Sequence, residues 1–305
     1  MIEAVACAKV NFSLRVGAVE ANGLHRVSGL FQSIDWIDRL TAEWSEEDEI
    51  VSMHGGPVIA EKENLAWRAA ELMRREAGSD RRLRIALHKN IPAAAGLGGG
   101  SADAAAALAA VGYMFGVAPT TELAAQLGSD VPFCLQGGTA EVGATGETVS
   151  ARDLPTGFAL GLVVPPVEIS TADVFAEWDA LGAPEGRPIG GTDLPPALRS
   201  GGPLINDLHP AAAAVAPILE EWRIELEARW GRPVLVTGSG PTLFAFFLDR
   251  GEATAAIDAI PPGARAATAA EPVPFGWVAR DGSKLWASTT TDESSKSLAA
   301  SLFDG

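Results

Sequence analysis

The chain has 305 residues, of which 47% are hydrophobic and 20% are charged, and its formal net charge at pH 7 is −16. This length favours two domains of about 100–200 residues each, and the composition is that of a folded chain rather than a disordered one. The negative charge opposes binding of nucleic acid, so a bound nucleotide would have to be held locally, by backbone amides and a few placed cations.

The two cysteines, Cys7 and Cys134, are too few for a disulfide framework and lack the spacing of metal ligands, which fits a reducing compartment. The N-terminal residues form no apolar signal region, and no segment approaches the roughly 18 uninterrupted apolar residues of a membrane span. We therefore expect a cytoplasmic protein with no membrane partner and no nucleic-acid partner. The oligomeric state stays open.

The N-terminal end favours β-strands. Apolar and polar residues alternate over residues 10–16, which is the pattern of a half-buried strand, and Lys9 shares the polar face with Asn11. Further strands are predicted at residues 30–36, 40–44 and 50–53.

A strand, a glycine-rich loop and a helix follow one another after these strands. Asn64 is the predicted N-cap of a helix that Gly78 ends, and alternation over residues 83–87 predicts a strand that leads into the loop. Ser101 is the predicted N-cap of the next helix, which runs to about residue 115 and carries Asp103 in its first turn.

The rest of the chain alternates between predicted helices and strands. The helices lie at residues 119–127, 170–178, 211–230 and 252–259, and the strands at residues 139–142, 158–164, 234–237, 243–248 and 264–269. Residues 182–203, rich in Gly and Pro, are predicted to form a loop. We expect an N-terminal domain over residues 1–155, a C-terminal domain over 156–279, and a flexible tail without periodicity over 280–305.

The glycine-rich run is the strongest functional signal. Gly96, Gly98, Gly99 and Gly100 stand between a strand and a capped helix, where backbone amides at a positive helix end can approach an anion. Phosphate is the natural ligand, and a flexible loop without a ligand is the structural alternative. A GxGxxG dinucleotide signature is absent, and no lysine follows the glycines as it would in a GxxxxGK[ST] loop.

This run resembles the second motif of the GHMP kinases, the superfamily of galactokinase, homoserine kinase, mevalonate kinase and phosphomevalonate kinase. Ala8-Lys9-Val10-Asn11 and the Val-Thr-Gly-Ser-Gly-Pro-Thr segment at residues 236–242 resemble two further motifs in the same order, so that the resemblance covers about residues 5–277. It implies an α+β, two-domain GHMP kinase fold, with a ribosomal protein S5 domain 2-like N-terminal domain and a ferredoxin-like C-terminal domain.

The resemblance also implies ATP as the phosphate donor. Asn64 and Leu65 match positions that line the adenine pocket, although a simple helix cap explains Asn64 equally well. The ATP-binding residues implied for the loop are Pro92, Ala93, Ala94, Ala95, Gly96, Leu97, Gly98, Gly99, Gly100, Ser101 and Ala102.

Within this superfamily the chain most resembles the 4-diphosphocytidyl-2-C-methyl-D-erythritol kinases of the non-mevalonate isoprenoid pathway. The resemblance implies transfer of the γ-phosphate of ATP to the 2-hydroxyl of the methylerythritol unit, with Mg²⁺. The stretches that carry it include Asn22-Gly23-Leu24-His25, Leu30-Phe31-Gln32, Glu63-Asn64-Leu65-Ala66, Gly128-Ser129-Asp130-Val131-Pro132-Phe133 and Ile169-Ser170-Thr171.

Two residues carry the chemistry that the resemblance implies. Asp130 would accept the proton of the substrate hydroxyl, while Lys9 would keep that carboxylate charged and steady the charge on the transferring phosphoryl group. Ser101 would contact phosphate or act as a Mg²⁺ ligand. The structural alternative for Asp130 is a helix cap, because Pro132 favours a helix start there.

Recognition of the substrate is implied for Asn11, Leu24, His25, Phe31, Thr171 and Phe175. His25 matches the histidine that reads the edge of cytosine, although a lone histidine can also be structural. Leu24 departs from the family, which commonly has an aromatic residue there, so cytosine is expected between Leu24 and Phe175 rather than between two aromatic rings.

The last motif, Gly238-Ser239-Gly240, is either a tight turn between strands or, by the resemblance, a loop beside the phosphate loop. Two other functions are alternatives. One is a kinase for homoserine or mevalonate, which His25 and Phe175 disfavour because these residues match positions that contact cytidine. The other is a nucleotide sensor without catalysis, which would tolerate the loss of Lys9 or Asp130, and both residues are present.

Overall fold

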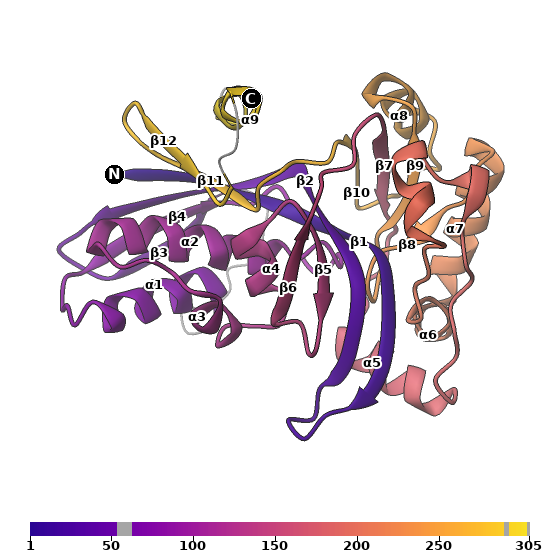
Figure 1. Ribbon diagram of the computed structural model, residues 1–305, viewed down its shortest axis with the longest axis horizontal. Helices are drawn as coiled ribbons and strands as arrows, with labels where there is room; N and C mark the ends of the chain where they lie inside the picture. Colours follow the sequence, from indigo (N-terminus) through magenta and orange to yellow (C-terminus); the bar gives the residue numbers. More distant parts are fainter. Residues whose placement is uncertain (54–62, 290–292, 304–305) are drawn as a thin grey trace.

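The computed structural model describes residues 1–53, 63–289 and 293–303. Two β-sheets, each covered by helices, lie side by side in the molecule, and the long hairpin β1–β2 extends along the boundary between them (Figure 1). Among the described residues, no helix is both long and apolar enough to cross a membrane.

The described part of the N-terminal sheet has eight strands. Six follow one another in the order β12-β11-β1-β2-β4-β3, and β5 pairs with both β2 and β6. Their bounds are β1 Ile2–Val19, β2 His25–Trp44, β3 Glu49–Met53, β4 Leu83–His88, β5 Thr139–Gly143, β6 Thr148–Arg152, β11 Trp277–Asp281 and β12 Lys284–Ala287.

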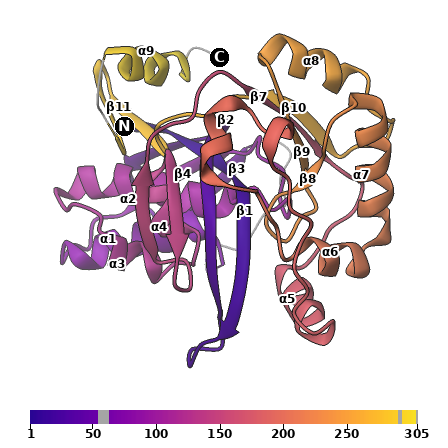
Figure 2. The same cartoon turned by 45° about the vertical axis from the view of Figure 1, so that its right-hand side comes forward.

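Strands β1 and β2 form a long antiparallel hairpin whose far end projects beside α5 (Figure 2). Pairing runs from Ile2 opposite Ala42 to Val19 opposite His25, with register shifts that bend the ladder. The two segments predicted at residues 30–36 and 40–44 are thus parts of one strand. The hairpin carries Lys9 near its middle and His25 near its tip.

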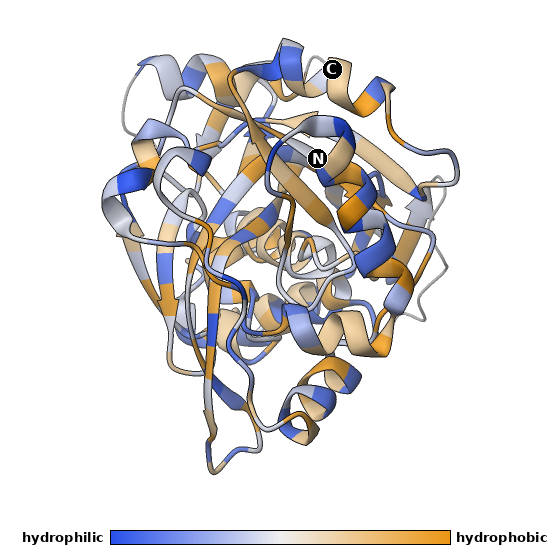
Figure 3. Ribbon diagram, turned by 90° about the vertical axis from the view of Figure 1, so that its right-hand side faces the viewer, coloured by the Kyte–Doolittle hydropathy of each residue, from blue (hydrophilic) through white to orange (hydrophobic). Residues whose placement is uncertain are grey.

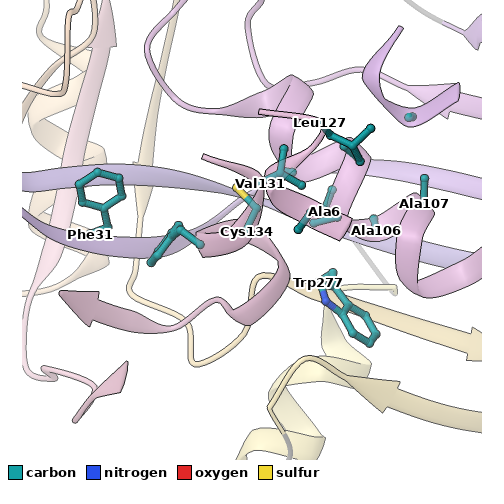
Figure 4. Packing of buried hydrophobic residues seen from close by; sticks show 14 of the residues in the cluster. Ala6, Phe31, Ala106, Ala107, Leu127, Val131, Cys134 and Trp277 are labelled. Carbon is teal, nitrogen blue, oxygen red and sulfur yellow. The ribbon is translucent and has the colours of Figure 1, made fainter. Parts of the chain in front are cut away.

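Four of the described helices lie together on one side of the N-terminal sheet (Figure 1). Their bounds are α1 Leu65–Glu76, α2 Gly99–Phe115, α3 Thr121–Ala125 and α4 Val131–Gln136. The alanines of α2 are buried, because small side chains let this helix approach both β1 and α1 closely. Figure 4 shows the same core at α4, where Val131 and Cys134 lie with Ala6, Ala106 and Trp277.

The C-terminal sheet is antiparallel and, in the described residues, has the order β10-β7-β9-β8. Along the chain the elements follow as strand, helices, strand, strand, helix, strand, which is the ferredoxin-like arrangement. The bounds are β7 Ala159–Val164, α5 Thr171–Ala180, α6 His209–Val215, α7 Pro217–Trp230, β8 Leu235–Val236, β9 Leu243–Phe247, α8 Arg250–Asp258 and β10 Ala266–Ala270. The expected α+β fold is therefore confirmed, and the apolar strands of its core stand out in Figure 3.

The prediction for the tail is wrong where the structure describes it. Strand β12 pairs with β11, and helix α9 (Glu293–Ser301) packs Ala299 against Cys7 and Val273, whereas residues 290–292 and 304–305 lie outside the described residues. The predicted limit at 279 falls inside β11, which pairs with β1. Short polar segments show little periodicity, and their order here comes from contacts with a distant strand.

Two helix predictions also need correction. The single helix expected over residues 211–230 is two helices, because Pro217 lacks the amide that would continue the first one and pushes Ala216 out of the helical region, to φ −137°. Ser101 is not the N-cap of α2. That helix begins at Gly99, after Gly98 in the left-handed conformation, so Ser101 lies inside the first turn.

The loop predicted over residues 182–203 is confirmed in most of its length. It contains two short 3₁₀ turns, Gly191–Asp193 and Pro196–Gly201, and a bridge that pairs Ile189 with Leu204.

Candidate active site

A cavity of about 1480 Å³ lies between the two domains and gathers most of the residues singled out above. Ala102 and Gly240 are the exceptions, because Ala102 is fully buried inside α2 and Gly240 packs behind the glycine loop. The residues that line the cavity are Lys9, Asn11, Leu24, His25, Phe31, Asn64, Leu65, residues 92–101, Asp130, Thr171, Phe175, Gly238 and Ser239.

The glycine loop is wedged between two other segments. At Gly96, with φ +76°, an added β-carbon would lie 2.5 Å from the carbonyl oxygen of Gly240, and at Gly98, with φ +68°, it would lie 2.8 Å from Cγ of Lys9. The amide of Lys9 also donates to the carbonyl of Leu97 at 2.9 Å. A loosely held linker does not fit these contacts. The loop delivers the N-terminal amides of α2 to the cavity, which is the arrangement that binds phosphate.

The C-terminal domain holds the other side of this loop. The hydroxyl of Thr242 donates to the carbonyl of Ala95 at 2.6 Å, and the guanidinium of Arg265 donates to the carbonyl of Ala93 at 2.8 Å. Asn206 holds the loop that contains Gly238, because its side-chain amide donates to the carbonyl oxygen of Gly238 at 2.8 Å. The glycine loop thus rests on both domains.

Lys9 and Asp130 meet in the cavity. The ammonium of Lys9 lies 3.3 Å from Oδ2 of Asp130 and donates to Oδ1 of Asn11 at 2.7 Å. Thr237 fixes Asn11 by donating from its hydroxyl to Oδ1 at 3.2 Å and by accepting from the Asn11 amide at 2.8 Å. Since Lys9 is only 5% exposed, water screens its charge little, and the charge acts mainly on Asp130 and Asn11.

The capping alternative for Asp130 does not hold. Asp130 does precede α4, but within the described residues its side chain makes no capping hydrogen bond, and one third of that side chain is open to solvent. For Asn64 the capping alternative is correct, because Oδ1 accepts from the amide of Ala66 at 2.9 Å at the start of α1. Asn64 also lines the cavity, so capping and a contact with a ligand are compatible.

Two charged residues that meet Asp103 at the start of α2, Asp38 and Lys89, were missed in the sequence analysis. Lys89 forms ion pairs with both Asp38 and Asp103, and the other oxygen of Asp38 accepts from the amides of Asn90 and Ile91 at 2.5 and 2.8 Å. This cluster of Asp38, Lys89 and Asp103 connects the residues just before the glycine loop to helix α2, which follows the loop. The sequence placed Asp103 only in the first turn of the helix, and its 14-residue separation from Lys89 is no recognised signal of an ion pair.

The cluster places two carboxylates beside one ammonium. Burial, with a further contribution from the Asp38 carboxylate, raises the pKa of Asp103 to about 7 against the opposing attraction of Lys89. Between about pH 4 and 7 the folded protein therefore retains a proton that the unfolded chain has lost. The stability contributed by this proton is present at low pH and lost as the pH rises through 7.

We expect Asp103→Asn to flatten this dependence, because an amide cannot lose the proton. The measurement is the free energy of unfolding in urea at pH 5.5 and pH 8 for both proteins. The native protein should lose more stability across this interval than the variant. Equal losses in the two proteins would contradict a shifted pKa at Asp103.

The far end of the cavity is aromatic. The ring of His25 stacks on Phe175, with centroids 4.9 Å apart and an interplanar angle of 27°, and it meets Trp178 edge-on at 5.6 Å. Nε2 of His25 lies 3.0 Å from Oδ1 of Asp179, a residue that the sequence analysis missed. Leu24 is 50% exposed and lines the same end of the cavity. The imidazole thus covers part of the Phe175 ring on which a base was expected to stack.

Thr171 and Phe31 also line the cavity. The hydroxyl of Thr171, at the start of α5, is 2.9 Å from the hydroxyl of Ser239, and the ammonium of Lys9 lies 5.4 Å from the centre of the Phe31 ring. The cavity is therefore lined by the glycine loop, by the Lys9–Asp130 pair and by the aromatic residues His25 and Phe175. A phosphoryl group could be transferred at the acid while a second, ring-bearing ligand occupies the pocket.

Comparison with known proteins agrees with this arrangement. Residues 64–138 match the family described as the GHMP kinases N terminal domain. The crystal structure of a homoserine kinase from Cytophaga hutchinsonii superimposes with a TM-score of 0.65 over 92% of this chain and 97% of that one, and at 17% identity this shows the shared fold alone. Fold and site together define a kinase of the GHMP type.

Relatives with higher identity narrow this class. The chain is 38% identical to a 4-diphosphocytidyl-2-C-methyl-D-erythritol kinase of Pelotomaculum thermopropionicum over 82% of this chain and 90% of the relative, and 40% identical to one of Moorella thermoacetica over 79% and 88%. A crystal structure of a 4-(cytidine 5'-diphospho)-2C-methyl-D-erythritol kinase has a TM-score of 0.71 and 32% identity over 88% of this chain and 98% of that one. The chain belongs to the 4-diphosphocytidyl-2-C-methyl-D-erythritol kinase family.

Proposed function

We propose that this protein transfers the γ-phosphate of ATP to the 2-hydroxyl of 4-diphosphocytidyl-2-C-methyl-D-erythritol. The observation that carries the proposal is the Lys9–Asp130 pair, 3.3 Å apart, in a cavity that has the glycine loop at one end and the His25–Phe175 stack at the other. Membership of the family supports the substrate, and the geometry supports the chemistry.

In the proposed reaction, the amides of the glycine loop and of the first turn of α2 bind the phosphates of ATP. The substrate hydroxyl oxygen attacks the γ-phosphorus, the bond from this phosphorus to the β-bridging oxygen breaks, and ADP leaves. The hydroxyl proton passes to Asp130, whose carboxylate Lys9 holds in place. Lys9 also faces the negative charge of the transferring phosphoryl group. Asn11 accepts a hydrogen bond from the ammonium of Lys9 and so keeps that ammonium at the cavity.

The residues present fit a magnesium ion. The described residues contain no group of three acidic, histidine or cysteine side chains that could hold a metal by themselves. Mg²⁺ in kinases commonly keeps several waters and takes its remaining ligands from phosphates and one or two protein oxygens. The Ser101 hydroxyl, which lines the cavity in the first turn of α2, is the protein oxygen that would contact it. When bound, the ion would neutralise charge on the phosphates of ATP.

The panel of substrates is the decisive experiment for this proposal. ADP release would be measured with 4-diphosphocytidyl-2-C-methyl-D-erythritol, mevalonate, phosphomevalonate and homoserine, each with Mg²⁺ and ATP. We expect release with the first alone. Release with homoserine or mevalonate instead would replace the proposed substrate, and ATP binding without release on any of them would favour a nucleotide sensor.

Phe175→Ala tests where the base lies. Loss of the ring removes stacking worth about 0.5–1.5 kcal/mol, so KM for the diphosphocytidyl substrate should rise about 2- to 12-fold. KM for ATP should stay unchanged, because adenine is expected to bind at other residues that line the cavity, Asn64 and Leu65. Leu24→Tyr should lower the first KM by adding a second ring. An unaltered KM in Phe175→Ala would place the cytidine elsewhere.

A further inference from the structure

Asp179 has no part in the proposed reaction, yet it touches the histidine at the aromatic end of the cavity. We infer that Asp179 is a positioning residue that fixes the tautomer of His25 and so selects cytosine over uracil. The inference rests on the proposed function, which brings a pyrimidine nucleotide to this end of the cavity. It adds the means by which the site distinguishes the two pyrimidines.

The contact is built into helix α5. Asp179 lies one helical turn after Phe175, so both side chains emerge on the same face of the helix. The imidazole of His25 lies on Phe175 and against Trp178, and its side chain is only 10% exposed. Packing on two sides therefore fixes the plane of the imidazole ring. The 3.0 Å contact of Nε2 with Asp179 fixes how the ring is oriented within that plane.

Neighbouring charges leave this contact undisturbed. A second cavity of about 420 Å³ shares His25 and Asp179 with the first in its lining, and Arg15 also lines it. The guanidinium of Arg15 is engaged by Asp207 and by Glu185, each at 2.8 Å. Within the described residues, Asp179 is thus paired with His25 rather than with Arg15.

The selection follows from the donors and acceptors. A carboxylate can only accept, so Nε2 of a neutral His25 must carry the proton, and Nδ1 is left with a lone pair. Cytosine presents an amino group at the position where uracil presents a carbonyl oxygen. An Nδ1 lone pair therefore accepts from cytosine but repels uracil. Without the carboxylate, the opposite tautomer also becomes available, and it would donate from Nδ1 and suit uracil.

Asp179→Asn is the informative variant, because the amide has the same shape but can either accept from Nε2 or donate to it. Both tautomers then become possible. We expect the ratio of kcat/KM for the diphosphocytidyl substrate to that for its diphosphouridyl analogue to fall about 10-fold, while KM for ATP and kcat at saturation stay within about twofold. Asp173→Asn, an exposed carboxylate on the same helix that does not line the cavity, is the matched control.

A spectroscopic measurement separates this role from a merely structural one. The chain has four histidines, so ¹⁵N-histidine spectra are simple, and His25→Gln assigns the signal of interest. At pH 8.5, where free imidazole is neutral, native His25 should show a proton on Nε2 alone, and Asp179→Asn should show a mixture of tautomers.

The possible failures are distinguishable. An unchanged cytidine-to-uridine ratio in Asp179→Asn, or a native His25 with its proton on Nδ1, overturns the inference and leaves the proposed kinase intact. No turnover of the diphosphocytidyl substrate by the native protein overturns the proposed function and the inference together.

Discussion

Asp130→Asn is expected to lower kcat by about 10²-fold or more, the loss typical of removing a positioned general base. The amide keeps the size of the side chain and still precedes α4, where the native carboxylate makes no capping bond, so the fold should be preserved. KM for ATP should change little, because the phosphates bind to the backbone amides of the glycine loop. The measurements are steady-state kinetics and a thermal-shift titration with Mg²⁺ and ATP.

Lys9 provides the test of whether this acid acts as part of a pair. Lys9→Met keeps a long side chain against Phe31 and removes the charge that lies 3.3 Å from Asp130. Residues that act as a unit show losses that do not add, so the double variant should be little worse than Asp130→Asn alone. Turnover of Asp130→Asn within about tenfold of the native protein would remove Asp130 from the role of base.

Local sequence patterns predicted the parts of this molecule that depend on neighbouring residues. The alternation before the glycine loop, the glycines themselves and the Asn64 cap are local features, and they recur in the structure as β4, the loop and α1. The fold class and the family came from motifs whose order along the chain is itself a signal.

Pairings between distant segments could not be predicted in the same way. Strand β11 joins β1 across more than 270 residues, and nothing in its short sequence specifies that partner. The same holds within the site, where Asp38 lies 51 residues before Lys89 and Asp179 lies 154 residues after His25. Each of these acids looks like a solvated surface residue until the fold brings its partner to it.

Gly98→Ala is expected to lower kcat/KM by about 10²-fold, since a displacement of about 1 Å in a reacting group costs this much. The added β-carbon would lie 2.8 Å from Cγ of Lys9, so the lysine that faces Asp130 must move. Left-handed backbone at an alanine also costs about 1–2 kcal/mol of stability. The measurements are steady-state kinetics at saturating Mg²⁺ and ATP, together with urea unfolding.

The control for the cost of left-handed backbone is Gly116, at the other end of helix α2. Gly116, which ends α2, has φ +71°, close to the +68° of Gly98, but an added β-carbon there would meet nothing within 4 Å. Gly116→Ala should therefore lose about the same 1–2 kcal/mol of stability and keep its activity. Loss of activity in Gly98→Ala alone would then trace to the displaced Lys9. Equal activity in the two variants would mean that Lys9 can leave its place beside the glycine loop without consequence for phosphoryl transfer.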